Sequence, residues 1–131
     1  MNEVRPVSKS GNQDTVFGSS DSGATIVDSM DTLYIMGLDE EFEKAKAWVA
    51  DHLDLGQMTG DVSVFETNIR YLGGLLSIFS LTGDPMFKWK AVHIADKLLP
   101  AFNTPTGIPY ALVNMRGGSA INFGWASGGS R

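Results

Sequence analysis

Apolar residues recur at helical spacing from the end of a polar N-terminal stretch onward. Ile26, Met30 and Leu33 share one helical face, which predicts a helix over Ala24–Met36 that ends at Gly37. A second helix is predicted to begin after this stop and to end near Leu53, with Asp39 as its N-cap and acidic residues in its first turn. Its apolar face is expected to consist of Phe42, Ala45, Val49 and Leu53.

The longest apolar pattern predicts a third helix from about Ser63 to Leu81, with a stop at Gly83. We expect its buried stripe to be Phe65, Ile69, Leu72, Leu76 and Phe79. Asp84 followed by Pro85 is a typical helix start, because Asp caps a helix and Pro suits the first helical position. The inner face of this fourth helix is predicted to be Phe87, Ala91, Ile94, Ala95 and Leu98, with Pro100 ending it.

The pattern predicts an all-α fold with four parts. Residues 1–23 are expected to be a polar arm, residues 24–53 a first helical hairpin and residues 63–99 a second one. Residues 103–131 are rich in Pro and Gly and are expected to be a loop segment, in which Tyr110 and Val113 are candidates for a short strand.

A repeat relates the two predicted hairpins. D-E-E-F at 39–42 corresponds to D-P-M-F at 84–87, and V-A-D-H-L at 49–53 corresponds to I-A-D-K-L at 94–98, both at an offset of 45 residues. Periods of this size are typical of helical solenoids and αα-toroids, which need roughly three or more units for stability. The pattern therefore predicts further hairpins as partners, and it is also compatible with a non-catalytic helical-repeat scaffold that binds another protein.

Composition narrows the function classes. The net charge is −5 without a cluster of Lys and Arg, which argues against nucleic acid and against an anionic membrane surface as partners. The chain has no cysteine, so neither a disulfide framework nor a Cys-ligated metal is expected. No signal peptide or membrane-spanning segment is visible in the sequence.

Glu66 is the strongest candidate for chemistry. It precedes Arg70 by four residues on one face of the third predicted helix, and Gly73, Gly74 and Ser77 continue that face. Adjacent glycines cost about 1 kcal/mol each in a helix, so close approach of another helix or a ligand would explain them. Before any resemblance is considered, the pattern favours structural roles for Glu66: it fits the third position of a capping box begun by Ser63, or a solvated ion pair with Arg70.

Asp28 and Asp31 form a second candidate, three residues apart on the first predicted helix without a basic residue within one turn. Such a pair is expected to face a sugar, a cation or a basic partner elsewhere, unless the face is simply exposed. His52 and His93 lack metal-ligand spacing, and neither is assigned a role. No protein ligand set for a metal is predicted in this chain.

Several blocks in their order resemble the class I α-1,2-mannosidases, glycoside hydrolase family 47. The most specific is S-V-F-E-T-N-I-R-Y-L-G-G-L-L-S at 63–77. The others are E-V-R-P-V-S at 3–8, I-V-D-S-M-D-T-L-Y-I-M-G-L at 26–38, L-L-P-A-F at 98–102, T-P-T-G-I-P-Y at 104–110 and W-A-S-G-G-S at 125–130. The resemblance covers nearly the whole chain.

The resemblance implies part of an (αα)7 barrel that binds Ca2+ and hydrolyses terminal α-1,2-linked mannose with inversion, on high-mannose N-linked glycans. Inverting glycosidases hold two carboxyl groups roughly 6.5–9.5 Å apart. In the family pattern Glu66 is the general acid, Arg70 contacts sugar, and Asp28 and Asp31 contribute to the substrate pocket. The general base, the remaining pocket carboxylates and the Ca2+ ligand are expected downstream of Arg131.

The resemblance therefore predicts an N-terminal piece of a catalytic domain that is inactive alone. It also implies the lumen of the endoplasmic reticulum or Golgi, in a type II membrane protein. An alternative within the same barrel family is a mannose-recognising degradation factor. I-M-G-L-D-E-E-F at 35–42 and T-P-T-G-I-P at 104–109 favour the processing enzymes.

Overall fold

The computed structural model describes residues 3–12, 17 and 21–129. Its first helical pair is α1 (Ala24–Ile35) and α2 (Asp39–His52), joined by a short turn. The second pair begins with one continuous helical run made of α3 (Val64–Thr67), a π-helical segment (Asn68–Leu72) and α4 (Gly73–Thr82). It continues into α5 (Pro85–Leu98) and a 3-10 turn (Leu99–Phe102).

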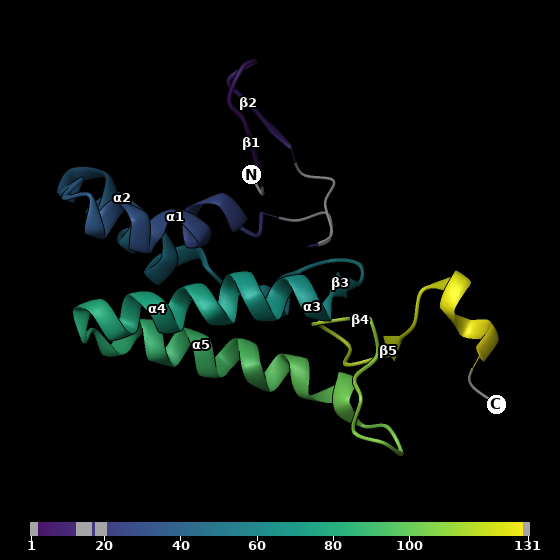
Figure 1. Cartoon of the computed structure of the whole chain (residues 1–131). Helices are drawn as coiled ribbons and strands as arrows, with labels where there is room; N and C mark the ends of the chain where they lie inside the picture. Colours follow the sequence, from purple (N-terminus) through teal and green to yellow (C-terminus); the bar gives the residue numbers. More distant parts are fainter. Residues whose placement is uncertain (1–2, 13–16, 18–20, 130–131) are drawn as a thin grey trace.

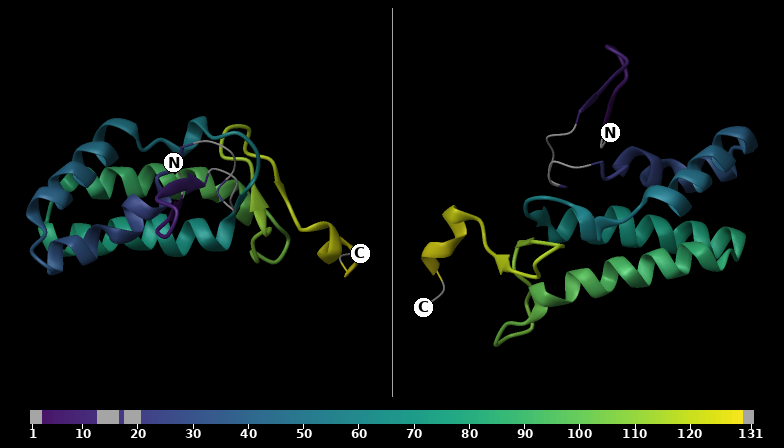
Figure 2. Two further views of the ribbon diagram at one scale, coloured as in Figure 1. Left: turned by 90° about the horizontal axis from the view of Figure 1, so that it is seen from above. Right: turned by 180° about the vertical axis from the view of Figure 1, so that it is seen from behind.

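The two helical pairs pack on each other through α1 and α4. Figure 1 shows α1 and α2 on one side of α4, with α5 on the other side. The right view of Figure 2 shows the same order from behind. The run α3–α4 is therefore the central element, and residues on the side that faces α1 border the space between the two pairs.

Short strands complete the described part of the chain. β1 (Glu3–Arg5) and β2 (Ser10–Asn12) form an antiparallel arm that projects near the N-terminal end of α1 (Figure 1). β3 (Val62–Ser63), β4 (Leu112–Val113) and β5 (Ala120–Ile121) form a small antiparallel sheet in the order β3-β4-β5. Two 3-10 turns cover Leu55–Gln57 and Gly124–Gly129. Of the predicted strand residues, Val113 lies in β4 and Tyr110 precedes it.

Local sequence signals explain most helix ends. Ser63 Oγ accepts a hydrogen bond of 3.2 Å from Glu66 N, and Asp84 Oδ1 accepts one of 2.9 Å from Met86 N at the start of α5. Gly83 closes α4 at φ 70°, in the left-handed region that favours glycine. The predicted N-cap at Asp39 is wrong: Leu38 is the cap, and Asp39 is the first helical residue, where its charge still suits the helix dipole.

The core confirms the predicted inner faces of α2 and α5 in the main. Phe42, Val49 and Leu53 are buried, as are Phe87, Ala91, Ile94 and Leu98 from α5. In α1 the fully buried residues are Ala24, Val27 and Met30, while Ile26 and Leu33 pack at the edge of the core.

The buried stripe predicted for the third helix is wrong. Its core-facing residues are Val64, Thr67, Tyr71, Leu75 and Ile78. Phe65, Ile69 and Leu76 are exposed, and Leu72 and Phe79 are half-buried. The helix is apolar on two neighbouring faces, so helical periodicity alone could not indicate which face packs against α5.

In the part of the chain that the structure describes, no helix has the length and apolar character needed to cross a membrane.

Candidate active site

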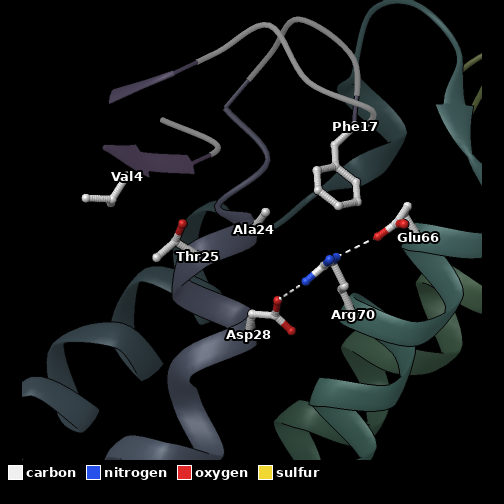
Figure 3. A pocket seen from close by; sticks show the side chains of 7 residues that line it. All are labelled: Val4, Phe17, Ala24, Thr25, Asp28, Glu66 and Arg70. Carbon is white, nitrogen blue, oxygen red and sulfur yellow. Dashed lines mark hydrogen bonds and ion pairs between the residues drawn. The ribbon is translucent and has the colours of Figure 1, made fainter. Parts of the chain in front are cut away.

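A polar cavity of about 450 Å³ lies where the N-terminal arm, α1 and the start of the α3–α4 run meet. Figure 3 shows Asp28 reaching it from α1, with Glu66 and Arg70 on the opposite wall. Phe17 lies above the two charged residues in that view. The full lining is Val4, Phe17, Ala24, Thr25, Asp28, Glu66 and Arg70.

The start of α3 positions Glu66 at this cavity. Ser63 caps the helix by accepting a hydrogen bond from the Glu66 amide, which places Glu66 in the first turn. Among the described contacts, the Glu66 carboxylate makes the ion pair and not the return bond of a capping box: its Oε2 accepts a hydrogen bond of 2.7 Å from Arg70 Nε. Its side chain is 28% exposed. The expected ion pair with Arg70 is thus confirmed, but it lies at a cavity wall rather than on a plain surface.

Arg70 joins two carboxylates from different helices. Besides its bond to Glu66, its Nη1 donates to Asp28 Oδ2 at 2.7 Å. The pKa of Arg70 is raised above its ordinary value, first by the hydrogen bond to Glu66 and then by the bond to Asp28. The residue lies in the π-helical segment, and single π turns within α-helices are frequent at functional sites.

Asp28 and Asp31 have different surroundings in the structure. Asp28 lines the cavity and forms an ion pair with Arg70, which supplies the basic partner that is missing from its own helix. Asp31 is absent from the lining, and its Oδ2 accepts a hydrogen bond of 2.9 Å from Ser77 Oγ on α4. Asp31 therefore fastens α1 to α4 one turn away from the cavity, and its predicted contact with substrate stays a prediction.

Phe17 is a lining residue that sequence reasoning did not find. It is 3% exposed and packs edge-on against the buried ring of Tyr71, with ring centroids 5.2 Å apart. The two rings are 54 positions apart in the sequence, so no local pattern could have indicated the contact. Its ring gives the cavity one apolar wall beside the charged groups.

The two histidines lie away from this cavity. His52 stacks on Trp48, and His93 Nε2 lies 3.2 Å from Asp54 Oδ1. Among residues 3–12, 17 and 21–129, no three or more His, Cys, Asp or Glu side chains are grouped so that they could hold a metal ion.

The cavity combines two carboxylates and a guanidinium with the aromatic ring of Phe17, and paired helices hold these groups in place. Carboxylates and a guanidinium bind hydroxyl groups, and a carboxyl at a cavity wall is also able to transfer a proton. Such a site suits a ligand rich in hydroxyl groups.

The comparisons with known proteins name the family. The model of glycosyl hydrolase family 47 matches residues 1–130, and the chain belongs to that family. It is 57% identical over 129 residues to the mannosyl-oligosaccharide α-1,2-mannosidase IA of Drosophila melanogaster, covering 98% of this chain and 19% of that protein. It is also 57% identical over 129 residues to the human mannosyl-oligosaccharide 1,2-α-mannosidase IB, covering 98% and 20%. The chain thus spans about a fifth of the length of these curated relatives.

A solved structure agrees with the fold. The α-1,2-mannosidase from Trichoderma reesei superposes with a TM-score of 0.78 at 29% identity, over 92% of this chain and 27% of that one. The predicted family and the predicted helical fold, part of an (αα)7 barrel, are therefore confirmed.

Proposed function

We propose that the complete protein is a mannosyl-oligosaccharide 1,2-α-mannosidase that hydrolyses terminal α-1,2-linked mannose with inversion. Family membership and the names of the similar relatives support this activity. The single observation that carries it is the Glu66 carboxylate, which is held at the wall of a sugar-sized polar cavity by a helix cap and a guanidinium.

Glu66 is the proposed general acid. It would donate its proton to the glycosidic oxygen as the bond from that oxygen to the mannose C1 breaks. A water molecule would attack C1 from the opposite face of the ring, and a second carboxylate would take its proton. Asp28 is unsuited to that second role, because the Arg70 guanidinium lies between it and Glu66 (Figure 3). The base is therefore expected from another part of the complete protein.

Arg70 and Asp28 are the proposed substrate contacts. Both line the cavity, and each remains about two-fifths exposed, which leaves room for sugar hydroxyls to reach them. Asp31 is proposed to support them by holding α1 against α4 through Ser77.

Calcium is part of the proposal for the complete protein only. The described residues do not fit a Ca2+ site, since Ca2+ takes six to eight oxygen ligands and no cluster of three acidic or histidine side chains occurs among them. No step of the mechanism is derived through the ion.

The proposed substrates are high-mannose N-linked glycans on glycoproteins. The proposed location is the lumen of the endoplasmic reticulum or Golgi, with the protein anchored as in type II membrane proteins. Both follow from the family resemblance.

Hydrolysis of a high-mannose N-glycan tests the proposal. The protein expressed from its complete coding sequence, with Ca2+ present, is expected to release mannose whose first anomer, read by proton NMR, is β. Release of α-mannose first would contradict inversion. Binding of the glycan without release would instead favour the mannose-recognising alternative, and no interaction at all would refute the proposed function.

A further inference from the structure

In the structure the carboxylate of Glu66 is bonded to a cation. Arg70 Nε donates to Glu66 Oε2 at 2.7 Å, and a hydrogen bond from a guanidinium favours the charged form of a carboxyl group. A general acid has to carry a proton before the glycosidic bond breaks. A loosening of this bond when the substrate is in place would therefore favour the protonated form that an acid needs.

Asp28 offers Arg70 an alternative partner. Arg70 Nη1 already donates to Asp28 Oδ2 at 2.7 Å, and a guanidinium can form two parallel bonds with one carboxylate. Asp28 lies on α1, whereas Glu66 and Arg70 lie on the same continuous helical run. A small turn of the Arg70 side chain towards α1 would therefore free Glu66 without breaking the ion pair with Asp28.

The helix that carries Asp28 is fixed in place. Ser77 Oγ donates to Asp31 Oδ2 at 2.9 Å, one turn along α1 from Asp28. Gly74 also brings the α4 backbone against Val27, the neighbour of Asp28. Arg70 is 42% exposed, so its side chain has room to turn while α1 stays in place.

We propose that Asp28 is a positioning residue that acts through Arg70: it attracts the guanidinium away from Glu66 and so lets Glu66 take up the proton that it later donates. This inference rests on the proposed function. The proton comes from solvent, Arg70 stays protonated throughout, and the net change on substrate binding is one proton gained by Glu66.

Two of the described lining residues other than Glu66 carry a charge. Of the seven residues that line the cavity, Asp28 comes from α1 and Arg70 from the π-helical segment. The remaining four lining residues carry no charge: Val4 from β1, Phe17, Ala24 and Thr25. Removing the charge of Asp28 would leave Arg70 with Glu66 as its carboxylate partner in the cavity and would favour the ionised form of Glu66.

The pH dependence of kcat/KM in the complete protein tests the proposal, because its basic limb reports loss of the proton from the acid in the free enzyme. Asp28→Asn is expected to move this limb to lower pH by about one unit, and so to lower kcat/KM at pH 7 by up to about tenfold. Asp28→Glu, which keeps the charge, is expected to return the limb towards its original position. Glu40→Gln is the matched control, since Glu40 pairs with Lys44 on the exposed surface of α2.

Each outcome has a distinct meaning. If Asp28 only contacts sugar or only supports the fold, Asp28→Asn changes KM or lowers the rate at every pH while the limb stays in place, and the proposal is overturned. If the unmodified protein releases no mannose, the proposed function itself fails.

Proton uptake keeps the test valid should Asp28→Asn fail to fold. Calorimetry in two buffers of different ionisation enthalpy measures the protons bound when a thio-linked α-1,2-mannobiose binds to the unmodified protein. We expect uptake of about one proton at pH 7, which is the proton that the proposal assigns to Glu66 on binding. Absence of uptake would show that Glu66 does not gain a proton on binding, which contradicts the proposal.

Discussion

Gly74 of α4 lies directly against Val27 of α1. A Cβ built on Gly74 would come within 3.4 Å of both Cγ1 and the carbonyl oxygen of Val27. Gly73, its neighbour in the sequence, faces elsewhere: a Cβ there would meet only Asn68 O of its own helical run, at 3.7 Å. Gly74 thus allows the close approach of α1 and α4, whereas Gly73 has no part in it.

The two glycines are expected to respond differently to substitution. Gly74→Leu should destabilise the fold by about 1–3 kcal/mol, because the larger side chain would force α1 away from α4. Gly73→Leu is the control and should be neutral or stabilising by up to about 1 kcal/mol, since glycine weakens a helix interior. Urea unfolding followed by circular dichroism measures both changes. Equal losses at the two positions would contradict the close packing of α1 on α4.

A second contact ties the helical pairs together at the opposite end of α4. Lys46 Nζ of α2 lies 2.7 Å from Asp84 Oδ2, while Asp84 Oδ1 caps α5. Asp84→Ala should cost about 1 kcal/mol by removing the cap, and Asp84→Asn should cost less because Asn also caps helices. Similar losses in the two variants, again by urea unfolding, would show that the ion pair rather than the cap stabilises this corner.

The same ion pair predicts a pH dependence of stability. The hydrogen bond from Lys46 lowers the pKa of Asp84 below its usual 3.8, with the backbone bond from Met86 adding to it. The bond to Asp84 raises the pKa of Lys46 above its usual 10.5. The contribution of Asp84 to folding stability is therefore complete above pH 3.8 and is lost as the pH falls through the lowered pKa. The contribution of Lys46 is complete below pH 10.5 and is lost as the pH rises through the raised pKa.

Thermal unfolding across pH checks this dependence. The original protein should lose stability more steeply than Asp84→Asn as the pH falls below about 4, since the variant has no carboxyl to protonate at this position. Parallel curves for the two proteins would mean that the ion pair does not contribute.

Helix positions could be predicted from the sequence because their signals are local. Asp84 with Pro85, Gly83 and the spacing of Val49 and Leu53 each act within one or two turns, and the structure agrees with them. The packing face of the third helix could not be predicted in the same way. Its apolar residues cover two neighbouring faces, and the choice between them depends on α5, which lies beyond the helix in sequence.

The individual site residues could be predicted from the sequence, but the contacts between residues of different helices could not. The spacing of Glu66 and Arg70 indicated their ion pair, and the unpaired Asp28 indicated a distant partner. That Arg70 is this partner depends on the approach of α1 to α4 over 42 positions of sequence, which no local spacing records. The different placement of Asp31 has the same cause, since Ser77 is available only through that approach.

The polypeptide of residues 1–131 alone is expected to release no mannose. An inverting hydrolase needs two carboxyl groups with space for water between them. The one carboxylate that lines the described cavity together with Glu66 is Asp28, and Arg70 occupies the space between the two. Incubation of the purified polypeptide with a high-mannose glycan and Ca2+ checks this. Release above that of a Glu66→Gln control would mean that the segment contains its own base.

The central claim is that Glu66 donates a proton to the leaving group. Its most direct test compares two substrates for Glu66→Gln in the complete protein. A mannosyl-α-1,2-mannose linkage needs a proton on its leaving oxygen, whereas α-mannosyl fluoride has a leaving group that departs without one. The account predicts that Glu66→Gln lowers kcat on the disaccharide by about 10²–10⁴-fold and leaves kcat on the fluoride nearly unchanged. An equal loss on both substrates would contradict it.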